Sequence, residues 1–287
     1  CTGTVPVAWT SPVPQATFGV QIYDDVTAQR LTLQAIEAGF RSFFTSPEAG
    51  NQLGFARAIR ESGVPRDQLF LAGSLLCDDA DGFRSARRKT AAALEASMAD
   101  LNQGGVCSLD LLMLERPARS ASAIRGQWLA LQEGQQAAGA TLLGVANFDL
   151  SEVDVVCSAS AGKGASPCVN QLPLSLGVRM DHAGLVRAHA ARGVAVQSWG
   201  PLGGPDGRIP RPALAEAEAI GRSLRGADCA SGHGRSACAV LLRWVIQQGA
   251  GFVVHSRVKS HLREDLEALE FELSPEQMQR LTRAAGI

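Results

Sequence analysis

Residues 107–117 read Cys-Ser-Leu-Asp-Leu-Leu-Met-Leu-Glu-Arg-Pro, an apolar run that ends in Glu115, Arg116 and Pro117. A short apolar run of this kind is typical of a parallel strand that is buried on both faces. The charge that follows predicts that the carboxyl end of the strand opens into a pocket. In α/β barrels the catalytic groups lie at such strand ends. The segment therefore predicts an α/β protein and makes Glu115 the first candidate site residue.

Seven further segments have the composition of strands, and helical patterns separate them. The predicted strands are Ala16–Ile22, Arg41–Thr45, Leu69–Leu75, Leu109–Leu114, Thr141–Ala146, Cys168–Leu172, Val194–Trp199 and Phe252–His255. The predicted helices are Thr27–Ala38 (with Thr27 as N-cap), Gln52–Ser62, Ser85–Leu101, Ala121–Ala138, Ser151–Ser158, His182–Ala191, Arg211–Leu224, Ala237–Gln248, His261–Leu269 and Ser274–Ala285. This alternation implies a parallel sheet, and eight units in one chain of this length predict a closed (β/α)8 TIM barrel.

An open doubly wound sheet is the alternative fold. Against it, no predicted strand is followed by the glycine-rich turn that such sheets use to bind dinucleotide phosphates. The 287 residues contain no linker and no internal repeat. Residues 1–287 are therefore predicted to form a single domain, with residues 1–15 as an N-terminal extension or hairpin.

Composition excludes several classes of function. Hydrophobic residues make up 46% of the chain and charged residues 19%, which is typical of a globular protein with a large core. The net charge of −1 argues against a nucleic-acid-binding protein. No apolar stretch is long enough to span a membrane.

Seven scattered cysteines are typical of buried thiols, and they predict neither a disulfide framework nor a metal site. Cys229 and Cys238 bracket one loop, where a bridge could form in an oxidising compartment. The sequence begins at Cys1 rather than at a methionine, which is expected either after removal of a leader or in a sequence that simply starts there. These two observations hint at a processed organellar protein, with a cytoplasmic location as the alternative.

Nine segments between residues 16 and 285 resemble, in the correct order, the aldo-keto reductases, which are NADPH-dependent (β/α)8 enzymes. The segments are Ala35–Arg41, Gly50–Gln52, Arg66–Phe70, Leu109–Leu114, Gly144–Phe148, Val169–Gln171, Trp199–Gly203, Leu241–Trp244, and Leu262–Leu266 with Phe271–Leu273. The resemblance implies a catalytic tyrosine that protonates the substrate carbonyl as hydride arrives. It also implies a lysine, held by an aspartate, that lowers the pKa of the tyrosine, and a histidine that orients the carbonyl.

This chain departs from the family at all four catalytic positions. Phe44 replaces the aspartate, Ala49 the tyrosine, Ser74 the lysine and Glu115 the histidine. Tyr23, the only tyrosine, follows the first strand, and we interpret it as a solvated or hydrogen-bonded loop residue. The sequence therefore predicts a catalytically inactive protein, a pseudoenzyme with a structural, assembly or ligand-binding role that includes a place beside other chains of a larger assembly.

In that interpretation Glu115 is a structural acceptor for backbone N–H groups or for an arginine, because a buried carboxylate needs a partner. The alternative is an NADP(H)-dependent oxidoreductase of altered chemistry that acts on a small carbonyl compound. It would use Glu115 as acid and base, with Tyr23 as a further candidate. A non-catalytic NADP(H) sensor is a third hypothesis.

The resemblance also implies where a dinucleotide would bind. Asn147 and Gln171 would hold the nicotinamide amide, although Ala146 replaces a serine beside them, and Trp199 would stack on the ring. At the phosphate end imidazoles replace permanent cations, and Asp265 replaces an adenine-binding asparagine, so NADP(H) is expected to bind weakly or not at all. The candidate cofactor-binding residues are Asn147, Gln171, Trp199, Leu202, Gly203, His255, Ser256 and His261.

Overall fold

A closed barrel of parallel strands forms the centre of the computed structural model, which describes residues 8–20, 23–77, 79–161, 165–204, 207–224 and 234–287. Each strand pairs with its neighbours in sequence, and β8 closes the ring by pairing with β1. The TIM-barrel prediction is confirmed. The strands are β1 Ala16–Gly19, β2 Ser42–Thr45, β3 Phe70–Leu75, β4 Leu111–Leu114, β5 Leu142–Ala146, β6 Pro167–Pro173, β7 Ala195–Trp199 and β8 Gly251–Val254.

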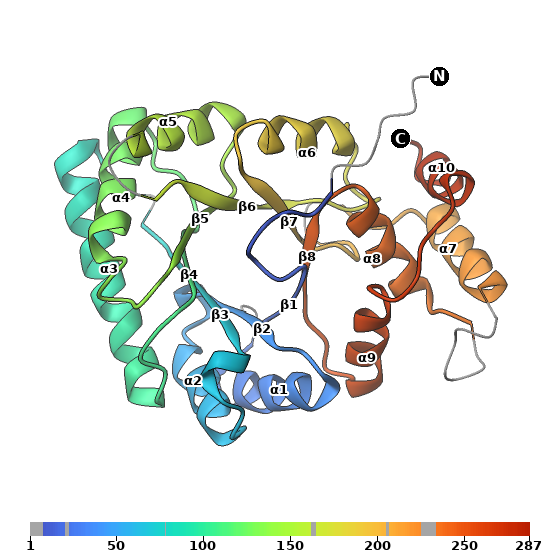
Figure 1. Cartoon of the computed structure of the whole chain (residues 1–287), viewed down its shortest axis with the longest axis horizontal. Coiled ribbons are helices and arrows are strands. Elements are labelled where there is room, and N and C mark those ends of the chain that lie inside the picture. Colours follow the sequence, from blue (N-terminus) through green and yellow to red (C-terminus); the bar gives the residue numbers. More distant parts are fainter. Residues whose placement is uncertain (1–7, 21–22, 78, 162–164, 205–206, 225–233) are drawn as a thin grey trace.

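Helices surround the barrel on its outside (Figure 1). The α-helices are α1 Asp25–Ala38, α2 Gln52–Glu61, α3 Gly82–Gly104, α4 Ala121–Gly134, α5 Leu150–Ser160, α6 His182–Ala190, α7 Arg211–Ser223, α8 Ala237–Gln247, α9 Lys259–Glu267 and α10 Pro275–Ala284. Two short 3-10 helices, η1 Pro47–Ala49 and η2 Arg66–Gln68, lie in connecting segments. Of these two, η1 matters for the site because it follows β2 at the carboxyl end of the barrel.

The N-cap predicted for α1 is wrong. Asp24, not Thr27, is the capping residue: its side chain accepts the backbone N–H of Thr27 at 2.9 Å, so Thr27 lies inside the first turn. Aspartate is as good an N-cap as threonine. The helix begins directly after Asp24 because the Asp24 side chain accepts a hydrogen bond from the first turn. The end of α4 also differs, at Gly134 rather than Ala138.

Side chains that point into the barrel form an apolar cluster with a few polar groups beside it. Phe44, Met113 and Val253 belong to the apolar cluster in the middle, and all of them are buried. Nearer the amino ends of the strands, Gln197 donates to Thr17 at 3.1 Å, and Thr17 shares a hydrogen bond of 2.8 Å with Ser42. The interior is therefore a packed core.

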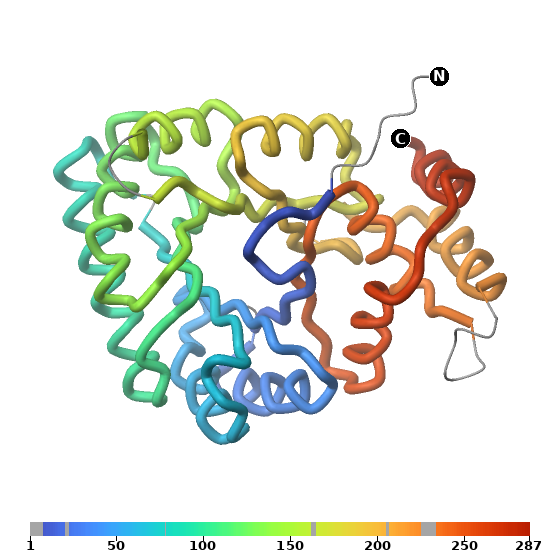
Figure 2. The backbone as a smooth tube through the Cα atoms, viewed as in Figure 1, coloured from blue at the N-terminus to red at the C-terminus, as the bar shows by residue number. Residues whose placement is uncertain are grey.

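The segment before β1 covers the amino end of the barrel. Val13 packs in the inner apolar cluster, and Trp9 donates its indole N–H to the carbonyl of Val13 at 3.0 Å. Figure 2 shows this blue segment looping across the centre of the barrel. Residues 8–15 contain neither helix nor strand. That residues 1–287 form one domain, with residues 1–15 as an extension or hairpin, stays a prediction.

Two other expectations concern a disulfide bridge and a membrane span. Cys229, one member of the suggested Cys229–Cys238 bridge, lies outside the described residues. Among the helices that the structure describes, none combines the length and the apolar composition needed to cross a membrane.

Candidate functional site at the carboxyl end of the barrel

Glu115 follows the last residue of β4 and lies almost entirely inside the barrel mouth, with 4% of its surface exposed. Its backbone N–H donates to the carbonyl of Leu75 at 3.0 Å, which extends the strand pairing by one residue. The hydroxyls of Ser46 and Ser74 both donate to its Oε2, at 2.6 and 2.7 Å. The ends of β2 and β3 thus supply the donors. Side-chain hydroxyls are thus among its donors, where backbone N–H groups or an arginine were expected.

The pKa of Glu115 is raised above its ordinary value, chiefly because burial disfavours the carboxylate. The two serine hydroxyls oppose this effect by stabilising the charged form. The neighbouring carboxyl of Glu48 adds to the rise. Glu115 therefore keeps its proton to a higher pH than an exposed glutamate does.

Glu48 connects the buried acid to the rim of the barrel. It lies in η1, where its backbone N–H donates to the Ser46 hydroxyl at 3.2 Å. Its Oε1 accepts a hydrogen bond from the guanidinium of Arg116 at 3.2 Å, and the side chains of both residues are about half exposed. Ser46 therefore hydrogen-bonds to both glutamates, and Glu48 also forms an ion pair with Arg116.

The four positions that depart from the family have different fates. Ser74 and Glu115 are brought into direct contact. Phe44 is buried beneath them in the apolar cluster, where no charged group could be accommodated without a partner. Ala49 ends η1 and is half-buried. Of the replaced residues, Ser74 and Glu115 are therefore hydrogen-bonded to each other, whereas Phe44 belongs to the apolar interior.

Asn147 and Trp199 form a second polar group at the mouth. Asn147 is the one non-glycine residue in the described chain with a positive φ, 62°, directly after β5. Its amide donates to the carbonyl of Glu115 at 3.0 Å and accepts the indole N–H of Trp199 at 2.9 Å. These two bonds fix the planes of the amide and of the half-buried indole. The buried Gln171 donates to Gln197 at 2.8 Å from the adjacent strand.

The phosphate end of the expected cofactor site is built around Tyr23. This residue is buried, with 6% of its surface exposed, and its hydroxyl bonds to Nδ1 of His255 at 2.9 Å. The guanidinium of Arg257 lies 5.2 Å from the centre of the Tyr23 ring. Desolvation of the imidazole lowers the pKa of His255 although the residue as a whole has an exposed surface, so the ring is neutral near pH 7. Tyr23 is thus hydrogen-bonded and not solvated.

The remaining candidate residues are dispersed along the same side. Ser256 bonds to the backbone of Val258, and His261 is exposed in the first turn of α9. Leu202 is half-buried, and Gly203 has a φ of 93° that favours glycine. The structure therefore places Asn147 and Trp199 in mutual contact and leaves Ser256 and His261 separate from them in their bonding.

Asp265 in α9 is a buried carboxyl, with 2% of its surface exposed. Burial, helped by the charge of Glu264, raises its pKa to about 7.

Sequence reasoning missed Ser46, Glu48 and Arg116 as members of the site. No pattern in the sequence signals them, because Glu48 and Arg116 are 68 residues apart and meet only when the barrel brings the segments after β2 and β4, the two strands that flank β3, to the same end.

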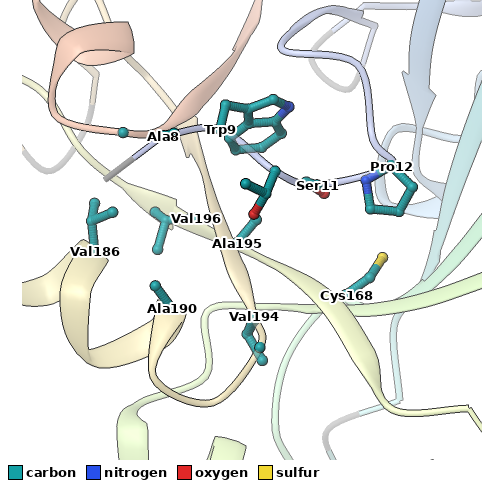
Figure 3. Close-up of a pocket in the computed structure, with 13 residues that line it drawn as sticks. Ala8, Trp9, Ser11, Pro12, Cys168, Val186, Ala190, Val194, Ala195 and Val196 are labelled. Atoms are coloured by element: carbon teal, nitrogen blue, oxygen red, sulfur yellow. The ribbon is translucent and has the colours of Figure 1, made fainter. Parts of the chain in front are cut away.

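A hollow at the opposite end of the barrel is separate from this site. It has a volume of about 130 Å³, and Figure 3 shows Trp9, Cys168, Val186 and Val196 around it. Its residues come mainly from the segment before β1, from α6 and from the amino ends of β6 and β7. Burial raises the pKa of Cys168 to about 11, which keeps this thiol protonated. Within the described part of the chain, no three His, Cys, Asp or Glu side chains gather in a way that could hold a metal ion.

Comparison with known proteins gives consistent matches. A family model described as the Aldo/keto reductase family matches residues 15–285. An aldo-keto reductase of Mycolicibacterium smegmatis is 29% identical over 279 residues, which cover 97% of this chain and 89% of the relative. An aldo-keto reductase of Mycobacterium tuberculosis is 28% identical over 272 residues, covering 94% and 86%.

Solved structures agree in fold. The aldo/keto reductase of Brucella melitensis superposes with a TM-score of 0.79 at 24% identity, over 98% of both chains. MGS-M4, an aldo-keto reductase enzyme from a deep-sea metagenome library of the Medee basin, has a TM-score of 0.79 at 19% identity, over 95% of this chain and 91% of its own. At these identities the similarity supports the barrel fold alone.

These matches contradict the prediction of a catalytically inactive protein with a structural or assembly role. The matched family and the relatives are named as reductases, and nothing in the matches indicates a pseudoenzyme. The prediction rested on the loss of the family's residue types at four positions, and that loss alone does not show an inactive protein. The relatives above are bacterial, and they give no support to an organellar location.

Proposed function

This chain belongs to the aldo/keto reductase family, and on that premise we propose that it is an NADP(H)-dependent oxidoreductase of altered chemistry that acts on a small carbonyl compound. The single observation that carries the proposal is Glu115. A buried carboxyl with a raised pKa lies at the end of a barrel strand, bonded by two serine hydroxyls. Strand ends of this kind hold the catalytic groups of α/β barrels.

The residues at the mouth fit a nicotinamide. A carboxamide needs both a donor and an acceptor, and Asn147 and Gln171 each use only part of their bonding capacity within the protein. The indole of Trp199 is fixed in orientation by Asn147 and half-buried, so one ring face is suited to stacking. These three residues would hold the nicotinamide end. When bound, the reduced nicotinamide supplies the hydride that the carbonyl carbon takes up.

Glu115 supplies the proton. The Glu115 carboxyl would donate its proton to the carbonyl oxygen of the substrate and would itself become a carboxylate. The hydroxyls of Ser46 and Ser74 then stabilise that carboxylate through charge-assisted hydrogen bonds. The carboxylate would recover its proton from solvent, and the raised pKa of Glu115 favours this recovery relative to an exposed glutamate. Glu115 would thus act as the general acid, a role that the family resemblance gives to a tyrosine at the position of Ala49.

The phosphate end predicts a modest affinity for NADP(H). His255 is engaged by Tyr23 and is neutral near pH 7, and Lys259 is paired with Glu37 at 2.5 Å. Arg257 lies over the Tyr23 ring, where it can still offer charge to a phosphate. Fewer permanent cations are available for the 2′-phosphate than the family resemblance implies, so NADPH is expected to be favoured over NADH by only a small factor.

Two measurements test the proposal together. NADPH and NADH are titrated against the protein while tryptophan fluorescence is followed, with Trp199→Phe as the variant that loses the signal. The cofactor is then consumed in the presence of small aldehydes and ketones by the wild-type protein and by Glu115→Gln. Saturable quenching with turnover that disappears in Glu115→Gln supports the proposal. No quenching at millimolar cofactor, or equal turnover by the two proteins, overturns it.

A further inference from the structure

We propose that Gln197 is a positioning residue that holds the Gln171 amide with its oxygen toward the barrel mouth, where this oxygen accepts a hydrogen bond from the carboxamide NH2 group of a nicotinamide. The inference rests on the proposed function, in which Gln171 contacts the nicotinamide, and it adds the group inside the barrel that orients Gln171. Gln197 on β7 pairs with Gln171 on β6, and its surface is 1% exposed.

The orientation of the Gln197 amide follows from a backbone carbonyl at the amino end of the barrel. Nε2 of Gln197 lies 3.4 Å from the carbonyl oxygen of Pro14 and 3.1 Å from Oγ1 of Thr17. A hydroxyl can donate or accept, but a carbonyl oxygen can only accept, so the NH2 group of Gln197 is the end that faces Pro14. Pro14 is itself held in place, because the next residue, Gln15, accepts the backbone N–H of Phe252 at 2.7 Å.

The orientation of Gln197 determines that of Gln171. With its NH2 group toward Pro14, Gln197 turns its Oε1 toward β6, and Nε2 of Gln171 donates to this oxygen at 2.8 Å. The oxygen of the Gln171 amide is therefore the end that points away from Gln197. This oxygen receives no hydrogen bond from the described residues, yet it is not among the unpartnered polar atoms that are buried from solvent. It is thus open to a donor from outside the protein.

The neighbouring amide of Asn147 is oriented in the same way. The backbone N–H of Asn147 donates to the carbonyl of Gln171 at 2.8 Å, so the two residues lie side by side at the mouth. The indole N–H of Trp199 can only donate and fixes Oδ1 of Asn147 toward it, whereas the Glu115 carbonyl can only accept and fixes Nδ2. Nδ2 keeps a second N–H. The mouth therefore offers a donor from Asn147 and an acceptor from Gln171, which match the C=O and NH2 groups of a carboxamide.

The test compares the binding of NADP+ with that of its 3-acetylpyridine analogue, in which a methyl group replaces the carboxamide NH2. The readout is the ratio of the two dissociation constants from isothermal titration calorimetry, and it requires no turnover. The wild-type protein should prefer NADP+ by about tenfold, because the analogue leaves the Gln171 oxygen without a donor. Gln197→Met has nearly the same size but cannot accept the bond from Gln171. The Gln171 amide is then free to turn, and the preference should disappear.

Two further variants separate orientation from packing. Gln197→Glu keeps an oxygen toward Gln171 whether or not its carboxyl is ionised, so it should retain the preference for NADP+. Gln247→Met is the matched control. Gln247 is a half-buried residue of α8, outside the barrel, whose amide also bonds at both ends, to the backbone of Leu273 at 2.7 and 2.9 Å. Its replacement should lower stability and leave the ratio of the dissociation constants unchanged.

A second measurement tests the orientation in the wild-type protein without cofactor. Nuclear magnetic resonance of a deuterated, isotope-labelled sample detects scalar coupling across a hydrogen bond, from the donor nitrogen to the carbon that carries the acceptor oxygen. Coupling from Nε2 of Gln171 to Cδ of Gln197 is expected. Coupling in the reverse direction, from Nε2 of Gln197 to Cδ of Gln171, would overturn the inference even if Gln197→Met failed to fold.

A preference for NADP+ that is lost in Gln197→Met and kept in Gln197→Glu supports the inference. It is overturned if the wild type shows no preference, if the preference survives in Gln197→Met or is lost in Gln197→Glu, or if neither dinucleotide binds. Turnover of a carbonyl compound with the same ratio in wild type and Gln197→Met would reject this inference and leave the proposed function standing. The expected ratios in a protein that never consumes NADPH would reject the proposed function alone.

Discussion

Replacement of Asp265 by asparagine should stabilise the protein, and the effect should depend on pH. Asp265 is 2% exposed, and burial together with the charge of Glu264 raises its pKa to about 7 from an ordinary 3.8. No described residue donates a hydrogen bond to this carboxyl in the structure. Asparagine has nearly the same size and shape but no charge, so the variant removes the cost of burying a carboxylate and changes little else.

The sign and size follow from proton linkage. Between about pH 4 and pH 7 the folded protein keeps a proton on Asp265 that the unfolded chain has lost, so the free energy of unfolding falls as the pH rises through this interval. At 1.36 kcal/mol per pH unit, a carboxyl lifted from 3.8 to about 7 costs about 4 kcal/mol once the pH exceeds 7. Asp265→Asn should therefore be more stable than the wild type by up to about 4 kcal/mol at about pH 8 and equal to it below about pH 4.

Guanidinium chloride unfolding at a series of pH values measures this difference directly. Asp100→Asn is the control, because Asp100 is an exposed residue of α3 and its replacement should leave the pH dependence unchanged. If Asp265→Asn and the wild type lose stability in parallel as the pH rises, the carboxyl is not titrating in a buried site, and the reasoning is refuted.

Three further predictions concern the barrel mouth. Phe44→Asp should destabilise the fold by at least about 3 kcal/mol in denaturant unfolding, since it removes a buried ring and buries a charge, whereas Phe44→Leu should cost less than about 1.5 kcal/mol; a smaller loss in the aspartate variant would contradict the packed interior. Ser46→Ala combined with Ser74→Ala should raise the pKa of Glu115 further and move the falling limb of the pH–rate profile to higher pH, and movement to lower pH would show that these hydroxyls do not stabilise the carboxylate. Glu115→Gln should abolish turnover and flatten the loss of stability with rising pH, because a raised carboxyl pKa destabilises the folded state above the ordinary titration range; an unchanged slope in chemical unfolding would argue that Glu115 is not desolvated.

Most of the fold could be predicted from sequence because the strands of a barrel are buried on both faces. The run ending at Leu114 reads as a strand for this reason, and the structure assigns Leu111–Leu114 to β4. The errors lie at helix ends, and at the start of α1 two residues could act as the N-cap. Asp24 and Thr27 are both suitable caps, and only the backbone path shows that Asp24 accepts the hydrogen bond.

The site was less predictable because its contacts join distant strands. Family resemblance identified Ser74 and Glu115 as replaced residues, yet it treated them as two separate losses. The structure shows one hydrogen bond of 2.7 Å between them, with Ser46 on the same oxygen. The environment that raises the pKa of Glu115 comes from burial and from Glu48, and neither is encoded in the order of residues around position 115. The prediction of an inactive protein rested on lost residue types alone, and the family match does not support it.

The most direct test of the central claim follows the transfer of deuterium from the cofactor to the product. The protein is incubated with NADPH carrying deuterium at the transferable position of the nicotinamide and with a small aldehyde or ketone, and the alcohol product is examined by mass spectrometry. Our account predicts deuterium on the carbinol carbon with the wild-type protein and none above background with Glu115→Gln. An unlabelled product, or equal labelling by the two proteins, would contradict the claim that this barrel reduces carbonyl groups with Glu115 as its acid.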